Sequence, residues 1–207
     1  MWIKQLGRAA LVAAVTTPVL ADQYILDGIK LRPDFLFGTG TSAYQIEGAT
    51  GSKAEGGKGV SIWDTFAHQK GQGHVINDED GDIAIDFYHT YARDMPLVRK
   101  AVGVNQWDMT IAWTRILPNG TGSTPNAAGL KFYKDVAKVA HENGMSVACT
   151  AYHWDLPQAL QDAYGGWLSS KVVDDFRNYV SVLMDGMGLS CDDWLSMNEP
   201  RTFCVEG

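Results

Sequence analysis

The chain has 207 residues, of which 45% are hydrophobic and 11% aromatic, and its formal net charge is −7 at pH 7. This composition fits a single globular domain and argues against an intrinsically disordered chain. The acidic balance and the lack of a basic run argue against nucleic acid or an anionic membrane surface as a partner.

The first 21 residues have the pattern of a secretory signal peptide. Lys4 and Arg8 precede an apolar stretch that is too short to span a membrane, and residues 19–21 form a small-x-small cleavage pattern. A mitochondrial presequence or an ordinary first helix is the alternative. We therefore expect a secreted mature chain, residues 22–207, without a membrane span.

Short apolar runs then alternate with longer helical patterns. Residues 35–40 are an apolar run that ends in glycines, and residues 61–68 resemble a short helical or looped insertion. A helical pattern extends from 81 to 100, and Pro96 should kink it.

The second half of the chain is more regular. Residues 104–112 predict a strand, and residues 145–152 predict another. Between them, Asn126 is a good N-cap for a helix that runs to Asn143, and Gly144 stands where a helix stops. These signals place one helix between two strands.

A further amphipathic helix is predicted around 172–183, and residues 193–197 form a final strand. Strands that alternate with helices indicate a parallel sheet, either open and doubly wound or closed as a (β/α)8 barrel. The stretch FGTGTSAYQ after the first strand lacks the GxGxxG spacing of a dinucleotide-binding loop, which weakens the nucleotide-binding option.

Polar and aromatic residues collect just after the predicted strands. They are Gln45, Glu47, Trp113, Arg115, His153, Trp154, Asp155, Asn198 and Glu199. In a barrel all of them would face one rim, where enzymes of that fold keep their active sites.

Three cysteines and one N-glycosylation sequon give information on the cellular compartment of the protein. An odd cysteine count in a secreted chain leaves at least one thiol unpaired or partnered elsewhere. We interpret Cys149 as a small buried hydrophobe, while Cys191 and Cys204 could pair, a point that the sequence leaves open. The NGT sequon at Asn119 lies in a stretch rich in Gly and Pro, which predicts a glycosylated surface loop.

Seven motifs follow one another along the chain: FLFGTGTSAYQIEGA, SIWDTFAH, GDIAIDFYHTYARDM, WTRILPNGTG, NAAGLKFYKDV, TAYHWDLPQALQDAYGGWLS and WLSMNEPRTF. Together they resemble glycoside hydrolase family 1, the β-glucosidases and their relatives, from about Phe35 to the last residue. YHWDLPQAL and NEP in this order are the specific signals. The resemblance implies a (β/α)8 barrel, of which about the first four βα units are present, and retaining hydrolysis of β-glycosidic bonds without a metal or organic cofactor.

The resemblance also implies residue roles. Glu199 of the NEP motif matches the acid/base, and Asn198 matches the residue that binds the sugar 2-hydroxyl. Gln45 and His153 match ligands of other sugar hydroxyls, and Trp154, beside His153, can pack on the apolar face of a pyranose. The expected substrate is a small β-glycoside or oligosaccharide.

Each of these residues also has a plainer interpretation when taken alone. Gln45 would be a turn residue, His153 a satisfied histidine at a strand end, and Glu199 a loop carboxylate. Glu47 and Glu55 are interpreted as structural or solvated. Core packing is the default for six tryptophans, with Trp113 and Trp194 the firmest: Trp63, Trp107, Trp113, Trp154, Trp167 and Trp194.

The chain departs from the family pattern in its length and in several motifs. Four strands are visible, whereas the barrel has eight and takes ~250 residues or more. No TENG-type motif, which carries the family nucleophile, occurs in the sequence. Asp108 aligns with the family arginine beside that nucleophile, where a carboxylate would raise the nucleophile's pKa. The family's GDRVKxW also aligns with GLSCDDW at 188–194 and loses basic residues.

Three functions therefore remain open. The first is the amino-terminal half of a secreted β-glycosidase, inactive alone because it lacks the nucleophile. The second is a non-catalytic half-barrel that binds carbohydrate or a partner, as Asp108 and the missing nucleophile suggest. The third, an open α/β nucleotide enzyme, has little support without the glycine fingerprint. The sequence leaves the sugar and aglycone specificity undetermined.

Overall fold

The computed structural model describes residues 32, 34–51 and 54–206, so the predicted signal peptide lies outside the described residues. The chain divides into two units, residues 1–36 and 37–207. The fold below is that of the second unit.

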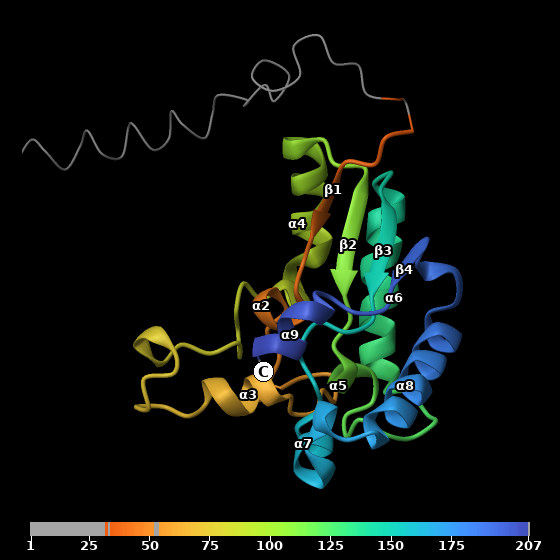
Figure 1. The fold of residues 1–207 in the computed structure, drawn as a ribbon. Helices are drawn as coiled ribbons and strands as arrows, with labels where there is room; N and C mark the ends of the chain where they lie inside the picture. Colours follow the sequence, from red (N-terminus) through yellow and green to blue (C-terminus); the bar gives the residue numbers. More distant parts are fainter. Residues whose placement is uncertain (1–31, 33, 52–53, 207) are drawn as a thin grey trace, which may run out of the picture. The chain divides into compact units, whose positions relative to one another are not determined.

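Four parallel strands form one sheet, and they lie side by side in chain order (Figure 1). The strands are β1 (Gly38–Gly40), β2 (Gln106–Thr110), β3 (Ser146–Thr150) and β4 (Asp193–Leu195). Trp107 in β2 is paired with Thr39 of β1 on one side and with Val147 of β3 on the other. Because neighbouring strands are parallel, helices must connect them, which is the βα alternation predicted from the sequence.

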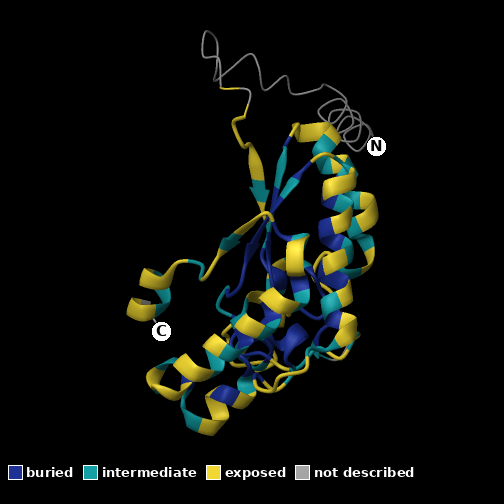
Figure 2. Ribbon diagram, turned by 90° about the vertical axis from the view of Figure 1, so that its right-hand side faces the viewer, coloured by how far each residue is buried: buried dark blue, intermediate teal, exposed yellow. Residues whose placement is uncertain are grey.

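Three long helices follow the first three strands. They are α4 (Phe87–Val102), α6 (Ala127–Glu142) and α8 (Lys171–Met187). Figures 1 and 2 show α4 and α6 against one face of the sheet, with buried residues concentrated between the two layers. In the part of the chain that the structure describes, no helix is both long enough and apolar enough to cross a bilayer.

Shorter helices and turns make up the rest of the connections between the strands and the segment after β4. They are α2 (Ala43–Ile46), α3 (Ile62–Ala67), α5 (Trp113–Ile116), α7 (Gln158–Tyr164) and α9 (Pro200–Glu206). The 3-10 turns are η3 (Ile76–Asp78), η4 (Gly166–Leu168) and η5 (Gly188–Ser190). Apart from η5, which leads into β4, these pieces lie in the segments that follow the carboxyl ends of the strands.

Helix α6 shows how local sequence sets an element. The side chain of Asn126 accepts a hydrogen bond from the backbone N–H of Ala128 at 3.3 Å, as an N-cap does. Tyr133 and Ala137 lie on the buried face. Gly144, with φ of 70°, follows the helix and turns the chain toward β3. The predicted cap and stop are confirmed.

Strand β2 separates an apolar face from a polar one. Trp107 and Met109 are buried against the helices. Their neighbours Gln106 and Asp108 are partly exposed and point to the opposite face, since side chains alternate along a strand. The apolar face belongs to a core in which the rings of Trp113 and Tyr179 stack with centroids 4.7 Å apart. The core placement predicted for Trp113 is confirmed.

A buried ion pair ties the connections after β1 and β2 together. Arg115 in α5 places its Nε 3.0 Å from Oε2 of Glu47, and the two side chains are 0% and 5% exposed. Tyr133 in α6 donates its hydroxyl to Oε1 of Glu47 at 2.8 Å. Arg115 also donates to the carbonyl of Gly48 and lies 4.7 Å from the ring centroid of Tyr88. Glu47 is therefore structural, as interpreted.

Helix α4 begins later than predicted. The pattern placed its start at 81, but the helix starts at Phe87, and Asp86 before it has a left-handed backbone with φ of 59°. The segment before Asp86 is held in turns by tertiary contacts: Gly81 donates its N–H to the hydroxyl of Tyr44 at 3.3 Å. Pro96 lies inside the helix, which continues to Val102.

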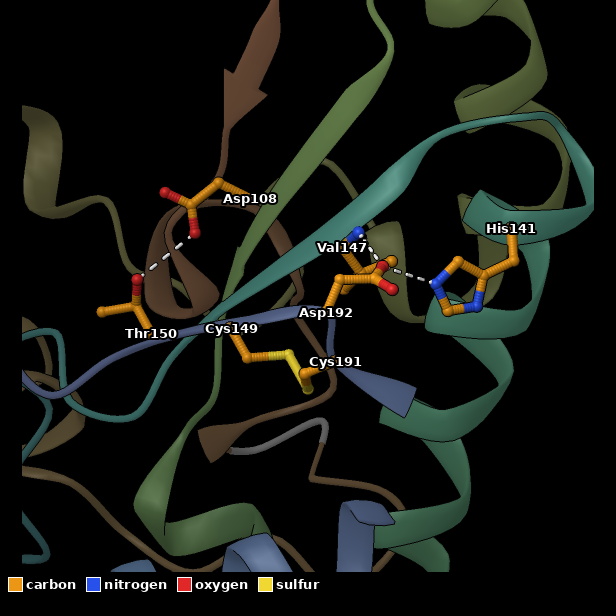
Figure 3. Close-up of a disulfide and its surroundings, with 7 residues drawn as sticks. All are labelled: Asp108, His141, Val147, Cys149, Thr150, Cys191 and Asp192. Atoms are coloured by element: carbon orange, nitrogen blue, oxygen red, sulfur yellow. Dashed lines mark hydrogen bonds and ion pairs between the residues drawn. A yellow bond between two sulfur atoms is a disulfide. The ribbon is translucent and has the colours of Figure 1, made fainter. Parts of the chain in front are cut away.

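The interpretation of Cys149 as a small buried hydrophobe was wrong, and Cys191 does not pair with Cys204, because Cys149 forms a disulfide with Cys191 (Figure 3). This bond links β3 to the residue two positions before β4, and Cys204 is left free and exposed. Asp192 strengthens the same junction, since its carboxylate accepts hydrogen bonds from the Val147 N–H at 2.7 Å and from His141 at 2.8 Å. The sequence could not show which strands would be neighbours.

We expect Arg115→Met to lower the free energy of unfolding by about 3–5 kcal/mol, because it leaves the buried charge of Glu47 without its partner. Urea unfolding measures the loss. Lys131→Met is the matched control, since Lys131 pairs with Asp135 on the exposed face of α6 and its loss should change the stability little. Equal losses in both variants would contradict the structural role of the pair.

We expect the double variant Cys149→Ala/Cys191→Ala to lose about 4 kcal/mol of stability, since the bond closes a loop with a sequence separation of 42 residues. Thermal or urea unfolding under non-reducing conditions measures it. Cys204→Ser is the control and should unfold like the original chain. A double variant as stable as the original would show that the bond does not form.

Candidate active site

Polar residues from three strand ends meet on one side of the sheet. Two backbone hydrogen bonds prolong the pairing of β3 and β4 past the strands themselves: Ala151 N–H to the Leu195 carbonyl, and Asn198 N–H to the Tyr152 carbonyl, both 2.9 Å. They bring the segment after β4 beside the segment after β3. Continued strand pairing thus brings together the part of the predicted carboxyl-end cluster that follows β3 and β4.

His153 and Asn198 are in direct contact. The side-chain amide nitrogen of Asn198 lies 3.0 Å from Nε2 of His153, which can accept a hydrogen bond from it when that ring nitrogen is unprotonated. The indole N–H of Trp154 donates to the backbone carbonyl of Asn198 at 3.1 Å. The three side chains therefore fix each other's orientation across the two segments.

A pocket of about 550 Å³ opens beside these residues. Its lining consists of Ser42, Tyr44, Gln45, Trp63, Ala67, Val75, Glu79, Asp80, Gly81, Ala84, His153, Trp154 and Glu199. Four residues singled out in the sequence, Gln45, His153, Trp154 and Glu199, thus line one pocket, and Asn198 joins them through His153. The volume suits a ligand the size of a small glycoside.

Part of this lining was missed by the sequence analysis. Trp63 was assigned to the core by default, but it is only half-buried and lines the pocket together with Tyr44. Glu79 and Asp80 lie in a loop that no periodic pattern describes. The acidic run from Asp78 to Asp82 was the one available signal, and an acidic run more often marks a solvated loop.

Tertiary contacts hold this loop against the pocket. The hydroxyl of Tyr44 donates to the carbonyl of Trp63 at 3.1 Å and accepts from the N–H of Gly81 at 3.3 Å. Lys70 forms an ion pair with Asp80 at 2.7 Å. Together, these contacts attach the loop to α3.

One group of side chains has donor atoms spaced as for a metal ion. Donor atoms of His68, Asp80 and Asp82 all lie within 4.8 Å of one another. The ammonium of Lys70 already supplies a positive charge to Asp80, and Asp82 lies 2.9 Å from the ring of His68. We interpret the group as an ion-pair network that anchors the loop.

Burial controls the charges near the site. It lowers the pKa of His153, although the carboxylates of Glu199 and Asp108 oppose that shift. Burial also raises the pKa of Asp108, whose Oδ1 accepts a hydrogen bond from the hydroxyl of Thr150 at 3.2 Å (Figure 3). His153 is therefore favoured in its neutral form, which can both donate and accept.

Asp155, just after Trp154, is a buried carboxyl group outside the pocket lining. Burial raises its pKa to about 7; the charge of Lys58 opposes this shift and that of Glu47 adds to it. Its Oδ1 has no hydrogen-bond partner among the described residues. The group supports the loop that carries His153 and Trp154.

The backbone is strained at two site residues. Trp154 has φ of 70° and Glu199 has φ of 45°, both in the left-handed region that side chains other than glycine rarely adopt. The hydrogen bonds across the two segments hold these conformations. Strain of this kind concentrates at functional sites, where it aims a side chain.

Comparison with known proteins gives one consistent result. A family model described as Glycosyl hydrolase family 1 matches residues 28–207. Beta-glucosidase 25 of Oryza sativa subsp. japonica is 42% identical over 175 residues, which cover 84% of this chain and 34% of that protein. Furcatin hydrolase of Viburnum furcatum is 44% identical over 177 residues, or 84% of this chain and 32% of that protein. The chain spans about a third of the length of these curated relatives.

Solved structures agree with the sequence relatives. A rice Os3BGlu6 β-glucosidase superposes with a TM-score of 0.78 at 39% identity, covering 85% of this chain and 35% of that one. The β-glucosidase of Thermotoga maritima in complex with deoxynojirimycin gives a TM-score of 0.77 at 39% identity, covering 85% and 38%. These neighbours are (β/α)8 barrels, and the four parallel strands correspond to part of such a barrel, as predicted.

We expect Asp155→Asn to remove a pH dependence of stability. The folded chain holds the Asp155 proton up to about pH 7, whereas the unfolded chain releases it near pH 3.8, the ordinary pKa of an aspartate. The free energy of unfolding should therefore fall as the pH rises from about 4 to 7, and remain lower above it. Relative to the original chain, the Asn variant should gain roughly 2–4 kcal/mol between pH 4 and pH 8.

Urea unfolding at pH 4, 6 and 8 measures this difference. Asp185→Asn serves as the control, since its carboxylate is exposed on α8. The stability difference between that variant and the original should stay nearly constant with pH. A constant difference for Asp155→Asn as well would show that Asp155 is ionised in the folded chain throughout.

Proposed function

Because this chain belongs to glycosyl hydrolase family 1, we propose that it supplies the acid/base part of an active site that hydrolyses β-glycosidic bonds with retention of configuration. The observation that carries the proposal is that Glu199, at the end of β4, lines the same pocket as Gln45, His153 and Trp154. A carboxylate beside amide, imidazole and indole groups suits a sugar whose leaving oxygen needs a proton.

In the proposed reaction Glu199 protonates the glycosidic oxygen as the bond to the leaving group breaks, through an oxocarbenium-like transition state. It then acts as a base toward the water that releases the sugar. The side chain of Glu199 lines the pocket, and its carboxylate has no hydrogen-bond or ion-pair partner among the described residues, so it is available to a substrate.

The sugar contacts follow from the same pocket. We assign the ring hydroxyls to Gln45 and His153, the 2-hydroxyl to Asn198, and the apolar sugar face to Trp154. The hydrogen bond between Asn198 and His153 would be exchanged for bonds to the sugar. The expected ligand is a small β-glycoside or oligosaccharide, and nucleic acid is not expected to bind.

A retaining active site needs a second carboxylate as its nucleophile, and none of the residues assigned above supplies it. The sequence has no TENG-type motif, so we propose that polypeptide beyond these residues supplies the nucleophile and that the 207-residue chain alone is inactive. Asp108 would stand where the family has an arginine, and its half-buried carboxylate would hinder ionisation of a neighbouring nucleophile.

We also propose that the mature chain starts after residue 21 and is secreted. The disulfide between Cys149 and Cys191 suits an oxidising compartment. Asn119, the proposed glycosylation site, is exposed in the turn after α5. Both observations agree with the signal-peptide pattern at residues 1–21.

The test joins this chain to the carboxyl-terminal part of Beta-glucosidase 25 from rice, which supplies the missing barrel units. In this chimera Glu199→Gln should lower kcat/KM for alkyl glucosides by about 10²–10⁴-fold, because their leaving groups need a proton. It should lower kcat/KM for a 2,4-dinitrophenyl glucoside much less, since that leaving group departs as an anion.

Glu142→Gln is the matched control, because Glu142 lies on α6 and pairs with Lys138 away from the pocket. It should leave both activities unchanged. Equal losses for the two substrates in Glu199→Gln would rule out the acid/base role.

Asp108 favours one alternative function, a half-barrel that binds carbohydrate or a partner without cleaving it. The same chimera distinguishes this binding role from the glycosidase role. A folded chimera that binds cellobiose in calorimetry but hydrolyses neither glucoside, even after Asp108→Arg, would support the binding role. Hydrolysis that rises on Asp108→Arg would support the glycosidase.

A further inference from the structure

The pocket has two walls of different chemistry. Gln45, His153, Trp154 and Glu199 form the wall at the strand ends, to which the proposed sugar contacts belong. The loop before α4 and helix α3 form the other wall, where Trp63, Glu79 and Asp80 line the pocket. No sugar contact is assigned to this second wall, so it is available to the group attached to the sugar.

The second wall has a fixed shape. The Tyr44 hydroxyl bridges Trp63 and Gly81 by two hydrogen bonds, and a Cβ added at Gly81 would lie 2.8 Å from the Tyr44 ring. The rings of Tyr44 and Trp63 stack with centroids 6.1 Å apart. Aromatic surface and loop backbone are therefore packed together. Glu79 directly follows η3, donates its backbone N–H to the Ile76 carbonyl at 3.3 Å, and lines the same pocket.

The charge of this pocket is negative without compensation. Asp80 is paired with Lys70, but the carboxylates of Glu79 and Glu199 have no ion-pair or hydrogen-bond partner among the described residues. Among the described residues, no lysine or arginine is part of the lining, and burial favours the neutral form of His153. The nearby Arg201, on α9, does not line the pocket.

We propose that the wall formed by Trp63 and Glu79 selects β-glycosides whose aglycone is aromatic and positively charged. The indole face attracts both an aromatic ring and a cation, and the Glu79 carboxylate attracts the cation. An anionic aglycone would be repelled by Glu79 and Glu199 together. This inference rests on the proposed function, because it assumes that the sugar occupies the first wall.

The experiment uses three glucosides that share a sugar and a ring and differ in charge: 4-(aminomethyl)phenyl, 4-(hydroxymethyl)phenyl and 4-carboxyphenyl β-D-glucoside. Binding to the 207-residue chain is measured by calorimetry at pH 7 in low and high salt. We expect the ammonium compound to bind about fivefold more tightly than the neutral one, and the carboxylate to bind more weakly than both. The differences should shrink as salt is added.

Substitutions assign the preference to a residue. Glu79→Gln should bring the ammonium and neutral compounds to nearly equal affinity, and Glu79→Lys should reverse the order. Glu142→Gln removes the same charge from a distant exposed position and should change nothing. Thermal unfolding verifies that each variant is folded, which we expect because the exposed Glu79 side chain has no partner to lose.

The outcomes distinguish this inference from the proposed glycosidase function on which it rests. Equal binding of all three glucosides, or a preference unchanged in Glu79→Gln, overturns the charge selection and leaves glycoside binding intact. Failure of all three to bind overturns the charge selection, whereas the proposed function is then decided separately by hydrolysis in the chimera. Binding of the ammonium compound that persists when its glucose is removed shows a cation site unrelated to the glycosidase.

Discussion

The ion pair between Arg115 and Glu47 is the interaction on which the arrangement at the strand ends depends. Glu47 follows β1, Arg115 follows β2, and Tyr133 joins them from α6, so one buried network fixes three consecutive parts of the barrel. Two charges in a dry interior are costly unless they pair closely with each other. This requirement sets the distance between the first two connections, and with it the position of α2, which carries Gln45.

Much of the fold could be predicted because its signals are local. Asn126 and Gly144 bound α6 through backbone chemistry that needs no distant partner. The elements that were misplaced depend on long-range contacts. The segment before Phe87 has a helical pattern, yet hydrogen bonds to Tyr44 hold it in turns. The pairing of Cys149 with Cys191 follows from the adjacency of β3 and β4, which a sequence does not state.

The same distinction between local signals and long-range contacts explains which residues of the candidate site were predicted. Gln45, His153 and Glu199 were found because each follows a predicted strand, and parallel strands present their carboxyl ends at one rim. Trp63 and Glu79 were missed because they lie in connections whose path is set by packing. A tryptophan at the edge of a pocket has the same local sequence as one in a core. Only the folded loop shows which of the two it is.

The disulfide has a consequence for the integrity of the chain. It encloses α7, η4 and α8 in a covalent ring, within which Leu168 is 95% exposed. A protease that cuts the backbone inside this ring produces two fragments that stay joined through sulfur, with β3 and β4 still paired. In an extracellular setting the chain could thus be nicked between Thr150 and Ser190 and keep Glu199 attached to the sheet until a reductant released it.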